Sequence, residues 1–242
     1  MNDELIYGIR PIIEAIKAGV EIHKIWLLQN KKNQLFKEVE SYASTKKIEL
    51  LFTSNKKLDK LSGKIHQGAL AQIKPFDLFD FNHLLKENDK KKNLTYLLLD
   101  GITDVRNFGA IFRSALATDV TGIIVPENNS ASINSDTIKA SAGAIFYIPV
   151  SKVNHLNDAI YELKARKFEI VGLEEKSGVN IFDENFNQKT ALILGSEGKG
   201  INKSTLNIVD KKVSIPMKGE IKSLNVSVAC GISLYHISKM RA

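Results

Sequence analysis

The sequence predicts an α/β protein with two domains, and three observations support this prediction. In the second part of the chain, apolar strand-like runs alternate with helical segments, which is typical of a parallel sheet covered on both faces. A similar alternation of shorter elements fills residues 1–73. Between the two parts, residues 74–92 begin near Pro75 and end in Asn-Asp-Lys-Lys-Lys, a composition typical of an interdomain connector.

Helical and strand patterns are short in the first part of the chain. Gly19 is expected to end the first helix, because glycine is favoured just beyond a helix C-terminus. The spacing of apolar residues predicts helices over residues 9–18, 34–44 and 55–61 and strands over residues 22–28, 49–52 and 68–73. Together these elements predict a small three-layer α/β module.

The connector contains one amphipathic segment, from Leu78 to Leu85. Because the composition around it is typical of a linker, we expect residues 74–92 to make few core contacts.

Six strands are predicted in the second part, separated by helical segments. They cover residues 95–99, 122–125, 145–150, 169–173, 191–194 and 212–215. On a helix that starts at about Asn107, the side chains of Ile111, Phe112 and Ala115 are expected to face the core. This alternation alone predicts an unknotted, doubly wound sheet, since threaded chains are very rare.

The charge balance favours a polyanionic partner. The 242 residues are 43% apolar and 25% charged, which is ordinary globular usage, and the formal net charge is +7. Residues 1–92 hold 17 Lys and Arg against 12 Asp and Glu, so most of the excess lies there. We therefore expect the first part to make most of the contacts with such a partner. The alternative is that lysine is scattered without a binding role.

Cysteine and histidine content predicts neither a disulfide nor a metal site. Cys230 is the single cysteine, so an internal disulfide is impossible, and the five histidines show no ligand spacing. The first residues lack the pattern of a signal peptide, and no apolar run reaches membrane-spanning length. We expect a soluble, cytoplasmic protein.

Three loops of similar layout stand out in the second part. The third along the chain, from Ile215 to Ala229, joins a turn, marked by Pro216 and Gly219, to an apolar helix. Ser223 and Asn225 stand at the mouth of that helix, where unpaired N–H groups need a partner. By itself this pattern is equally typical of an ordinary helix cap.

The second loop follows an apolar strand run that ends at Leu194. It holds three glycines between Gly195 and Gly200, which allow a backbone to approach a ligand closely. The outer spacing is that of a phosphate-binding P-loop, but Ile201 and Asn202 stand where that motif needs Lys and Ser or Thr. A P-loop nucleotide hydrolase is therefore excluded.

The remaining loop comes first along the chain. It connects the strand run that starts at Tyr96 to an apolar helix that carries a lone arginine. Asn107 and Arg113 lie at or near the loop end of this helix. Taken alone, Arg113 is more typical of a plain surface residue.

Together and in their order along the chain, the loops resemble the three signature motifs of the SpoU/TrmH branch of the SPOUT superfamily. These proteins are S-adenosylmethionine-dependent RNA ribose 2′-O-methyltransferases. The motifs read Asn107-Phe-Gly-Ala-Ile-Phe-Arg113, Gly195-Ser-Glu-Gly-Lys-Gly-Ile201, and Ile215 to Ala229. The segments Leu5 to Ile16 and His66 to Ala71 extend the resemblance to the N-terminal module. That pairing resembles the subgroup that methylates a guanosine in 23S ribosomal RNA.

Some positions depart from the family pattern or fit it ambiguously. Val105 stands where the family usually has Pro, Asp119 where Gly is usual, and His236 where Glu often follows the Tyr. The segment from Ala140 to Ala144 matches the family, but it is also typical of a helix end whose small residues allow close packing.

The resemblance implies a specific domain organisation. Residues 93–242 would form a SPOUT catalytic domain with a parallel sheet and a deep trefoil knot made by about residues 195–240. Residues 1–73 would form an L30e/L7Ae-like RNA substrate-binding domain, with residues 74–92 as the linker. A homodimer that acts on 23S ribosomal RNA, away from membranes, is implied as well.

The resemblance also implies which side chains act in catalysis. Arg113 would stabilise the developing alkoxide of the ribose, since arginine is effectively never deprotonated, although base action by Arg113 is left open. Asn107 and Glu197 would hold Arg113 and the ribose. Ser223 and Asn225 would position the target nucleotide or the methionyl end of the cofactor.

Cofactor contacts are expected to be mainly backbone contacts. By motif match they involve Gly195, Ile215 and Leu224, with Met217 and Gly219 lining the loop. The expected cofactor is S-adenosyl-L-methionine, without a metal.

Two other functions stay open at this point. The same reaction on transfer RNA, or on an antibiotic-target nucleotide of ribosomal RNA, would need no change in the motifs. A non-catalytic RNA-binding or ribosome-assembly protein would be expected to have lost Arg113, Glu197 or Asn225, and all three are present.

Overall fold

The computed structural model describes residues 4–31, 33–221 and 223–241. It divides into two compact units. Unit 1 comprises residues 1–77 together with residues 133–147, and unit 2 comprises residues 78–132 and 148–242. The segment 133–147 therefore belongs to unit 1, although it lies between two strands of unit 2 in the sequence.

Unit 1 is built on a four-stranded sheet with the order β1-β4-β2-β3. Strands β2 and β3 are parallel, and β4 is antiparallel to both β1 and β2. The strands are β1 (Glu4–Tyr7), β2 (Ile22–Leu28), β3 (Glu49–Thr53) and β4 (Ala69–Ile73). The helices are α1 (Ile9–Lys17), α2 (Gln34–Lys46), α3 (Asn55–Ser62), α6 (Ser135–Ala140) and the 3-10 helix η1 (Ala144–Tyr147).

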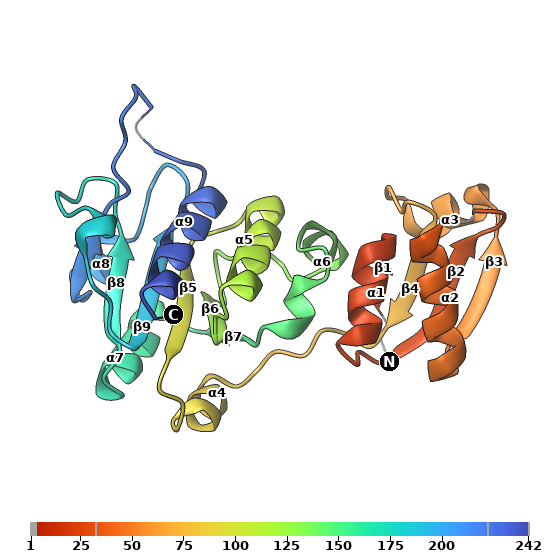
Figure 1. The fold of residues 1–242 in the computed structure, drawn as a ribbon, viewed down its shortest axis with the longest axis horizontal. Coiled ribbons are helices and arrows are strands. Elements are labelled where there is room, and N and C mark those ends of the chain that lie inside the picture. Colours follow the sequence, from red (N-terminus) through yellow and green to blue (C-terminus); the bar gives the residue numbers. More distant parts are fainter. Residues whose placement is uncertain (1–3, 32, 222, 242) are drawn as a thin grey trace. The chain divides into compact units, whose positions relative to one another are not determined.

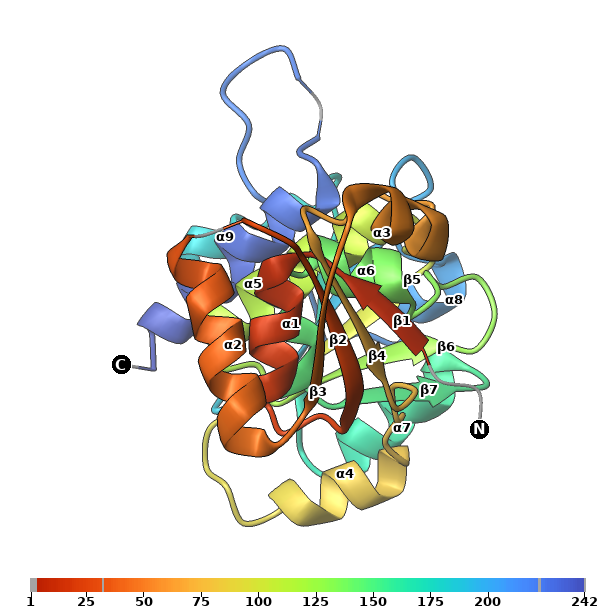
Figure 2. The ribbon, with the colours of Figure 1, turned by 90° about the vertical axis from the view of Figure 1, so that its right-hand side faces the viewer.

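Successive side chains along each strand point to opposite faces of this sheet, and helices cover both faces. Figure 2 shows α1 and α2 side by side along the sheet, with α3 on the other side. Leu58 of α3 packs against Tyr7 and Leu70, and Trp26 adds to this cluster. The predicted three-layer module is confirmed. The sequence patterns missed β1, which has only four residues.

Helix α6 packs against β1 through polar contacts. The hydroxyl of Tyr7 donates to the carboxylate of Asp136, and Lys64 Nζ lies 2.9 Å from the second oxygen of Asp136. Gly143 adopts a φ of 90°, and a Cβ built on it would lie 2.5 Å from Cβ of Glu14. The small residues after α6 therefore permit close packing within unit 1.

Unit 2 is built on a parallel six-stranded sheet with the order β10-β8-β9-β5-β6-β7. The strands are β5 (Leu94–Asp100), β6 (Gly122–Pro126), β7 (Val150–Val153), β8 (Glu169–Leu173), β9 (Lys189–Gly195) and β10 (Lys211–Val213). The helices are α4 (Phe81–Asn88), α5 (Val105–Ala117), α7 (Leu156–Ala165), α8 (Lys203–Leu206), α9 (Val226–Lys239) and the 3-10 helix η2 (Ile181–Asp183).

Helices cover both faces of the parallel sheet, as the alternation predicted. Helices α4 and α7 enclose one core cluster that includes Tyr96, Leu98 and Ile193. Helices α5 and α9 pack against each other, and α9 also contacts β9 (Figure 1). Ile111, Phe112 and Ala115 of α5 are buried, as expected.

Two predictions for unit 2 are wrong. Residues 145–150 do not form a strand, because η1 occupies Ala144–Tyr147 and Pro149 has no N–H to donate to a ladder, so β7 starts at Val150. The amphipathic part of the connector is also more than a linker. It forms α4, whose Leu84 and Leu85 are 1% and 2% exposed within the core cluster.

The sequence predicts no membrane-spanning segment. In the described part of the chain, no helix is both long and apolar enough to span a bilayer.

Candidate active site

The candidate active site lies where the loops after β5 and β9 leave the sheet. These strands are adjacent and parallel, with Asp100 opposite Gly195 in register. The carboxyl ends of parallel strands meet at one edge of a sheet, where α/β proteins commonly bind ligands. The first and second loops of the sequence therefore start side by side.

Asp104 fixes the start of α5. Its carboxylate accepts hydrogen bonds from the backbone N–H groups of Arg106 and Asn107, both at 2.8 Å. A carboxylate in this position satisfies free N–H groups and interacts favourably with the helix dipole. Asn107 is thereby held in the first turn of α5, half-buried beside the loop after β9.

The loop from Gly195 to Asn202 is closed by its own hydrogen bonds. Ser196 and Gly200 exchange backbone bonds of 3.2 and 2.9 Å, and Asp100 accepts a 2.8 Å bond from the backbone of Asn202. A Cβ built on Gly195 would lie 2.0 Å from the carbonyl carbon of Gly200. Since real Cβ atoms do not approach backbone so closely, only glycine fits where the loop folds back.

Asn225 joins the third loop to the other two. Its amide nitrogen donates to Asn107 Oδ1 and to Glu197 Oε1, both at 2.9 Å. The amide nitrogen of Asn107 donates to the same Glu197 oxygen, also at 2.9 Å. The oxygen of Asn225 accepts from the backbone of Ser227 at 3.0 Å and so caps α9. We call Asn107, Glu197 and Asn225 the polar triad.

Arg113 stands apart from the polar triad. It is exposed on α5, and within the described residues its guanidinium has no hydrogen-bond or ion-pair partner. The expected contact of Asn107 and Glu197 with Arg113 is therefore not made within one chain. The five donors of Arg113 remain available for a group outside the chain.

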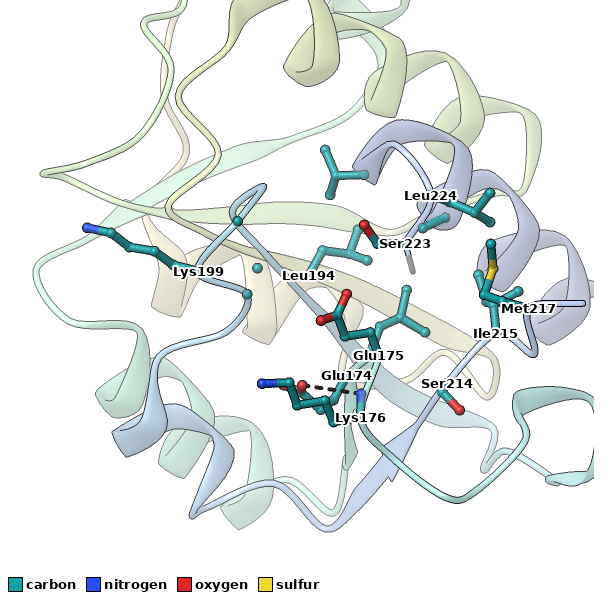
Figure 3. A pocket seen from close by; sticks show the side chains of 16 residues that line it. Glu174, Glu175, Lys176, Leu194, Lys199, Ser214, Ile215, Met217, Ser223 and Leu224 are labelled. Atoms are coloured by element: carbon teal, nitrogen blue, oxygen red, sulfur yellow. Dashed lines mark hydrogen bonds between the residues drawn. The ribbon is translucent and has the colours of Figure 1, made fainter. Parts of the chain in front are cut away.

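A cavity of about 400 Å³ opens beside the polar triad. Four of the five predicted cofactor residues line it, namely Gly195, Ile215, Met217 and Leu224. Ser223 lines it too, whereas Gly219 is outside the lining residues. Figure 3 shows the side chains of Leu194, Ile215, Met217 and Leu224 around the cavity, while Lys199 extends away from it.

The cavity has the properties that a nucleoside-like cofactor requires. Its volume is within the usual range for small-molecule sites, and its walls combine apolar side chains with polar groups from Glu174, Lys176 and Ser214. In the described part of the third loop, the backbone N–H groups of Ile215, Met217 and Leu224 have no internal hydrogen-bond partner. Such free groups are suited to binding the polar edge of adenine. The residues present therefore fit S-adenosylmethionine.

Sequence patterns did not single out Glu174, Glu175 or Lys176, which also line the cavity. These residues follow β8, which lies next to β9 in the sheet. The order of strands cannot be read from the sequence, so nothing placed the end of β8 at this site.

Comparisons with known proteins show the family of this chain. The profile of the SpoU rRNA Methylase family matches residues 94–235. The chain belongs to this family. A second profile, described as RNA 2′-O ribose methyltransferase substrate binding, matches residues 5–79. The recognised resemblance to RNA methyltransferases is thus confirmed, for both parts of the chain.

Relatives match along the whole chain. A Staphylococcus aureus protein that is assigned to the TrmH family of tRNA/rRNA methyltransferases is 36% identical over 242 residues, covering 100% of this chain and 98% of the relative. A protein of the same description from Staphylococcus haemolyticus is 34% identical, with 100% and 97% coverage.

Solved structures show the same fold. The SpoU methyltransferase AviRb from Streptomyces viridochromogenes is similar with a TM-score of 0.82 and 25% identity, covering 99% of this chain and 90% of that one. Its complex with the cofactor AdoMet gives a TM-score of 0.81. A TrmH/SpoU tRNA modifying enzyme of A. aeolicus is 31% identical over 66% of this chain and 82% of its own, with a TM-score of 0.57.

Proposed function

We propose that this protein transfers a methyl group from S-adenosylmethionine to the ribose 2′-hydroxyl of a guanosine in 23S ribosomal RNA, in the cytoplasm. The observation that carries the proposal is the polar triad, which ties three separate loops together beside a cavity suited to the cofactor. Membership of the SpoU family and the AdoMet complex of a similar structure support the same reaction.

The reaction needs a better nucleophile than a free hydroxyl. When bound, S-adenosylmethionine supplies an electrophilic methyl group on a sulfonium. The 2′-oxygen forms the new C–O bond as the C–S bond breaks, and its proton must leave. Donors that stabilise the developing negative charge, or an acceptor for the proton, lower the barrier.

Glu197 is proposed to accept that proton. Its Oε1 receives two amide hydrogen bonds, from Asn107 and Asn225, which fix the orientation of the carboxylate. Its Oε2 has no partner among the described residues, so one oxygen remains free to accept the hydrogen of the ribose hydroxyl. Ser223, which lines the cavity, is proposed to position the ribose or the methionyl end of the cofactor.

Arg113 is proposed to stabilise the developing alkoxide. Its guanidinium is permanently charged and has no hydrogen-bond partner within the described residues. Arg113 can therefore bind the ribose oxygen without first breaking a hydrogen bond inside the chain.

A homodimer is part of this proposal. Val228 and Tyr235 of α9 are 49% and 58% exposed and lie seven residues apart on one helix face, with Ile232 between them. Such an apolar stripe on a helix with no polar face is typical of an interface. A second copy of the chain is the partner that the family resemblance implies.

We also propose that unit 2 contains the deep trefoil knot implied by the resemblance. The chain leaves β10 at the edge of the sheet, yet α9 packs beside the central strand β9 and against α5. The segment between them is joined to the loop 195–202 through Asn225.

Unit 1 is proposed to select the RNA, as an L30e/L7Ae-like domain. The substrate-binding profile covers most of this unit, and residues 1–92 hold most of the net positive charge. Under this proposal, residues 1–73 form the substrate-binding domain, residues 74–92 connect, and residues 93–242 catalyse. Transfer RNA is the second candidate substrate, because the A. aeolicus relative is a tRNA modifying enzyme.

Mapping 2′-O-methylated nucleotides tests this function. Ribosomal and transfer RNA would be compared between cells that contain the protein, cells that lack it, and cells that carry Arg113→Ala. We expect one guanosine of 23S ribosomal RNA to lose its methyl group in the second and third strains. Loss at a tRNA nucleotide instead would select the second candidate, and no loss in either RNA would contradict the function.

A further inference from the structure

A second cleft of about 400 Å³ lies at the carboxyl ends of β5, β6 and β7. Asn128 and Asn129 follow β6, and Asn157 and Asp158 come from the first turn of α7. Asn202, at the N-terminus of α8, lines it from the other side. All of these residues belong to unit 2.

This cleft borders the same loop as the candidate active site. Asp100, which is 4% exposed, accepts hydrogen bonds from the backbone and the side chain of Asn202, at 2.8 and 2.5 Å. A Cβ built on Gly101 would lie 3.4 Å from Cβ of Ser196 and 3.1 Å from the amide nitrogen of Asn129. The loop 195–202 therefore lines the cofactor cavity with its glycines and the second cleft with Asn202.

The lining chemistry fits a nucleobase better than a phosphate. Five asparagines line the cleft, and each amide offers both donors and an acceptor, as the edge of a base requires. None of the described lining residues is Lys or Arg, and the carboxylate of Asp158 would repel a phosphate. A metal ion is also unsupported, since no three potential ligands from His, Cys, Asp and Glu come together in the described residues.

Several of these polar groups are free to bind a ligand. Within the described residues, the side chains of Asn128, His155 and Asp158 have no hydrogen-bond partner. The oxygen of Asn157 accepts from the hydroxyl of Thr205 at 3.0 Å, which orients its amide nitrogen as a free donor. His155 offers a flat ring at the rim, on which a base could stack.

We propose that this cleft binds an unpaired base of the RNA substrate, next to the nucleotide that is methylated. The inference rests on the proposed function, because it assigns a base-reading subsite to the same RNA. Proteins read single-stranded RNA through hydrogen bonds to base edges and through stacking on flat side chains. A carboxylate accepts from both N1–H and N2–H of guanine, so Asp158 favours guanine over uracil.

Titration with nucleoside 5′-monophosphates tests the subsite without requiring methyl transfer. In NMR spectra of the full chain, 5′-GMP is expected to shift the side-chain amide signals of Asn128 and Asn157 saturably, and more tightly than 5′-UMP. Asp158→Asn should weaken 5′-GMP binding on the order of tenfold, since one base contact is lost. Asn82→Ala, an exposed change on α4, should leave binding unchanged. Absence of shifts at the cleft, or equal binding of both nucleotides, would overturn the proposal.

Kinetics on the RNA substrate separate base reading from phosphate binding. Asn128→Ala and Asp158→Asn should each lower kcat/KM on the order of tenfold, with unchanged S-adenosylmethionine affinity and an unchanged salt dependence of RNA binding. A shallower salt slope in the Asn128→Ala variant would identify a phosphate site and refute base reading, because phosphate contacts set that slope. If the wild-type protein methylates no RNA, the proposed function fails, while the nucleotide titration still decides whether the cleft binds a base.

Discussion

Asn225 has two structural roles at once. Its side-chain oxygen caps α9 through the backbone of Ser227, and its amide nitrogen bonds to Asn107 and Glu197. Neither role alone requires an asparagine, because Ser or Asp also caps helices well. The amide supplies an acceptor for the cap on one atom and, on another, donors for both Asn107 and the Glu197 carboxylate, whereas a hydroxyl has a single donor. This dual use explains why a residue that resembles an ordinary helix cap belongs to the candidate site.

Two departures from the family pattern also have local explanations. Val105 is the first residue of α5, the position at which proline is favoured in helices but not required. Asp119 adopts a φ of 56°, the left-handed conformation that suits glycine and that Asp tolerates better than most residues. Neither departure disturbs the polar triad.

Arg113→Ala should slow methyl transfer while leaving cofactor affinity nearly unchanged. The guanidinium is exposed, has no partner within the described residues, and is absent from the lining of the proposed cofactor cavity. Loss of a donor that stabilises a developing anion typically costs on the order of a hundredfold to a thousandfold in rate. Single-turnover transfer and calorimetric titration with S-adenosylmethionine measure the two effects. Arg106→Ala, also exposed on α5, is the matched control, and an Arg113→Ala rate equal to its rate would remove Arg113 from the mechanism.

At the scale of elements, the proposed cofactor cavity depends on how closely the loop after β9 folds back. Gly195→Ala places a methyl group 2.0 Å from backbone atoms of Gly200, so the loop must move. Overpacking of this kind costs about 1–3 kcal/mol, which corresponds to roughly a tenfold to hundredfold loss of S-adenosylmethionine affinity if the native loop is needed for binding. Calorimetric titration measures this loss.

Gly219→Ala is the matched control for this change. Gly219 lies in the third loop outside the cavity lining, and a Cβ there would meet nothing within 4 Å. We expect its cofactor affinity to equal that of the wild type. Unchanged affinity in Gly195→Ala would mean that Gly195 is only a turn residue.

Most elements were predictable because their signals are local. Strands β2 and β8 have the predicted bounds, Ile22–Leu28 and Glu169–Leu173, since each is an apolar run between residues that break strands. Residues 145–150 have a similar apolar run, but the packing of residues 143–147 within unit 1 overrides it. The contribution of α4 to the core was missed, because the burial of Leu84 and Leu85 depends on packing against a sheet whose position sequence spacing does not show.

The candidate site was predictable only where motif order carries information. The motif resemblance placed Asn107, Glu197 and Asn225 in one site, and the structure brings them within hydrogen-bonding distance. The positions of the end of β8 and of the polar cleft depend on the order of the strands in the sheet. Sequence periodicity does not encode that order. The asparagines of the cleft are scattered from Asn128 to Asn202, so no sequence pattern connects them.

At the scale of the whole molecule, the boundary between the two units does not fall at a single position in the sequence. Residues 133–147 leave unit 2 after β6, pack within unit 1, and return at β7. A truncated chain that begins near Lys91 would lose α4, with its buried Leu84 and Leu85. It would also leave Asp136 without Tyr7 and Lys64. Separate roles for the units are therefore better tested by substitutions in the full chain.

The central claim of this account is that the polar triad, which joins three loops beside the cofactor cavity, is the site of methyl transfer. Asn225→Asp tests it most directly in a single-turnover assay of methyl transfer to the RNA substrate. Aspartate preserves the cap of α9 but removes the amide donor and places a second carboxylate beside Glu197. Asn82→Asp, an exposed change on α4, controls for the added charge.

We expect Asn225→Asp to keep the wild-type thermal midpoint within a few degrees and to lose on the order of a hundredfold in transfer rate, because one organising donor is gone and like charges face each other. Asn82→Asp should transfer at the wild-type rate. A folded Asn225→Asp protein that also transfers at the wild-type rate would contradict the claim.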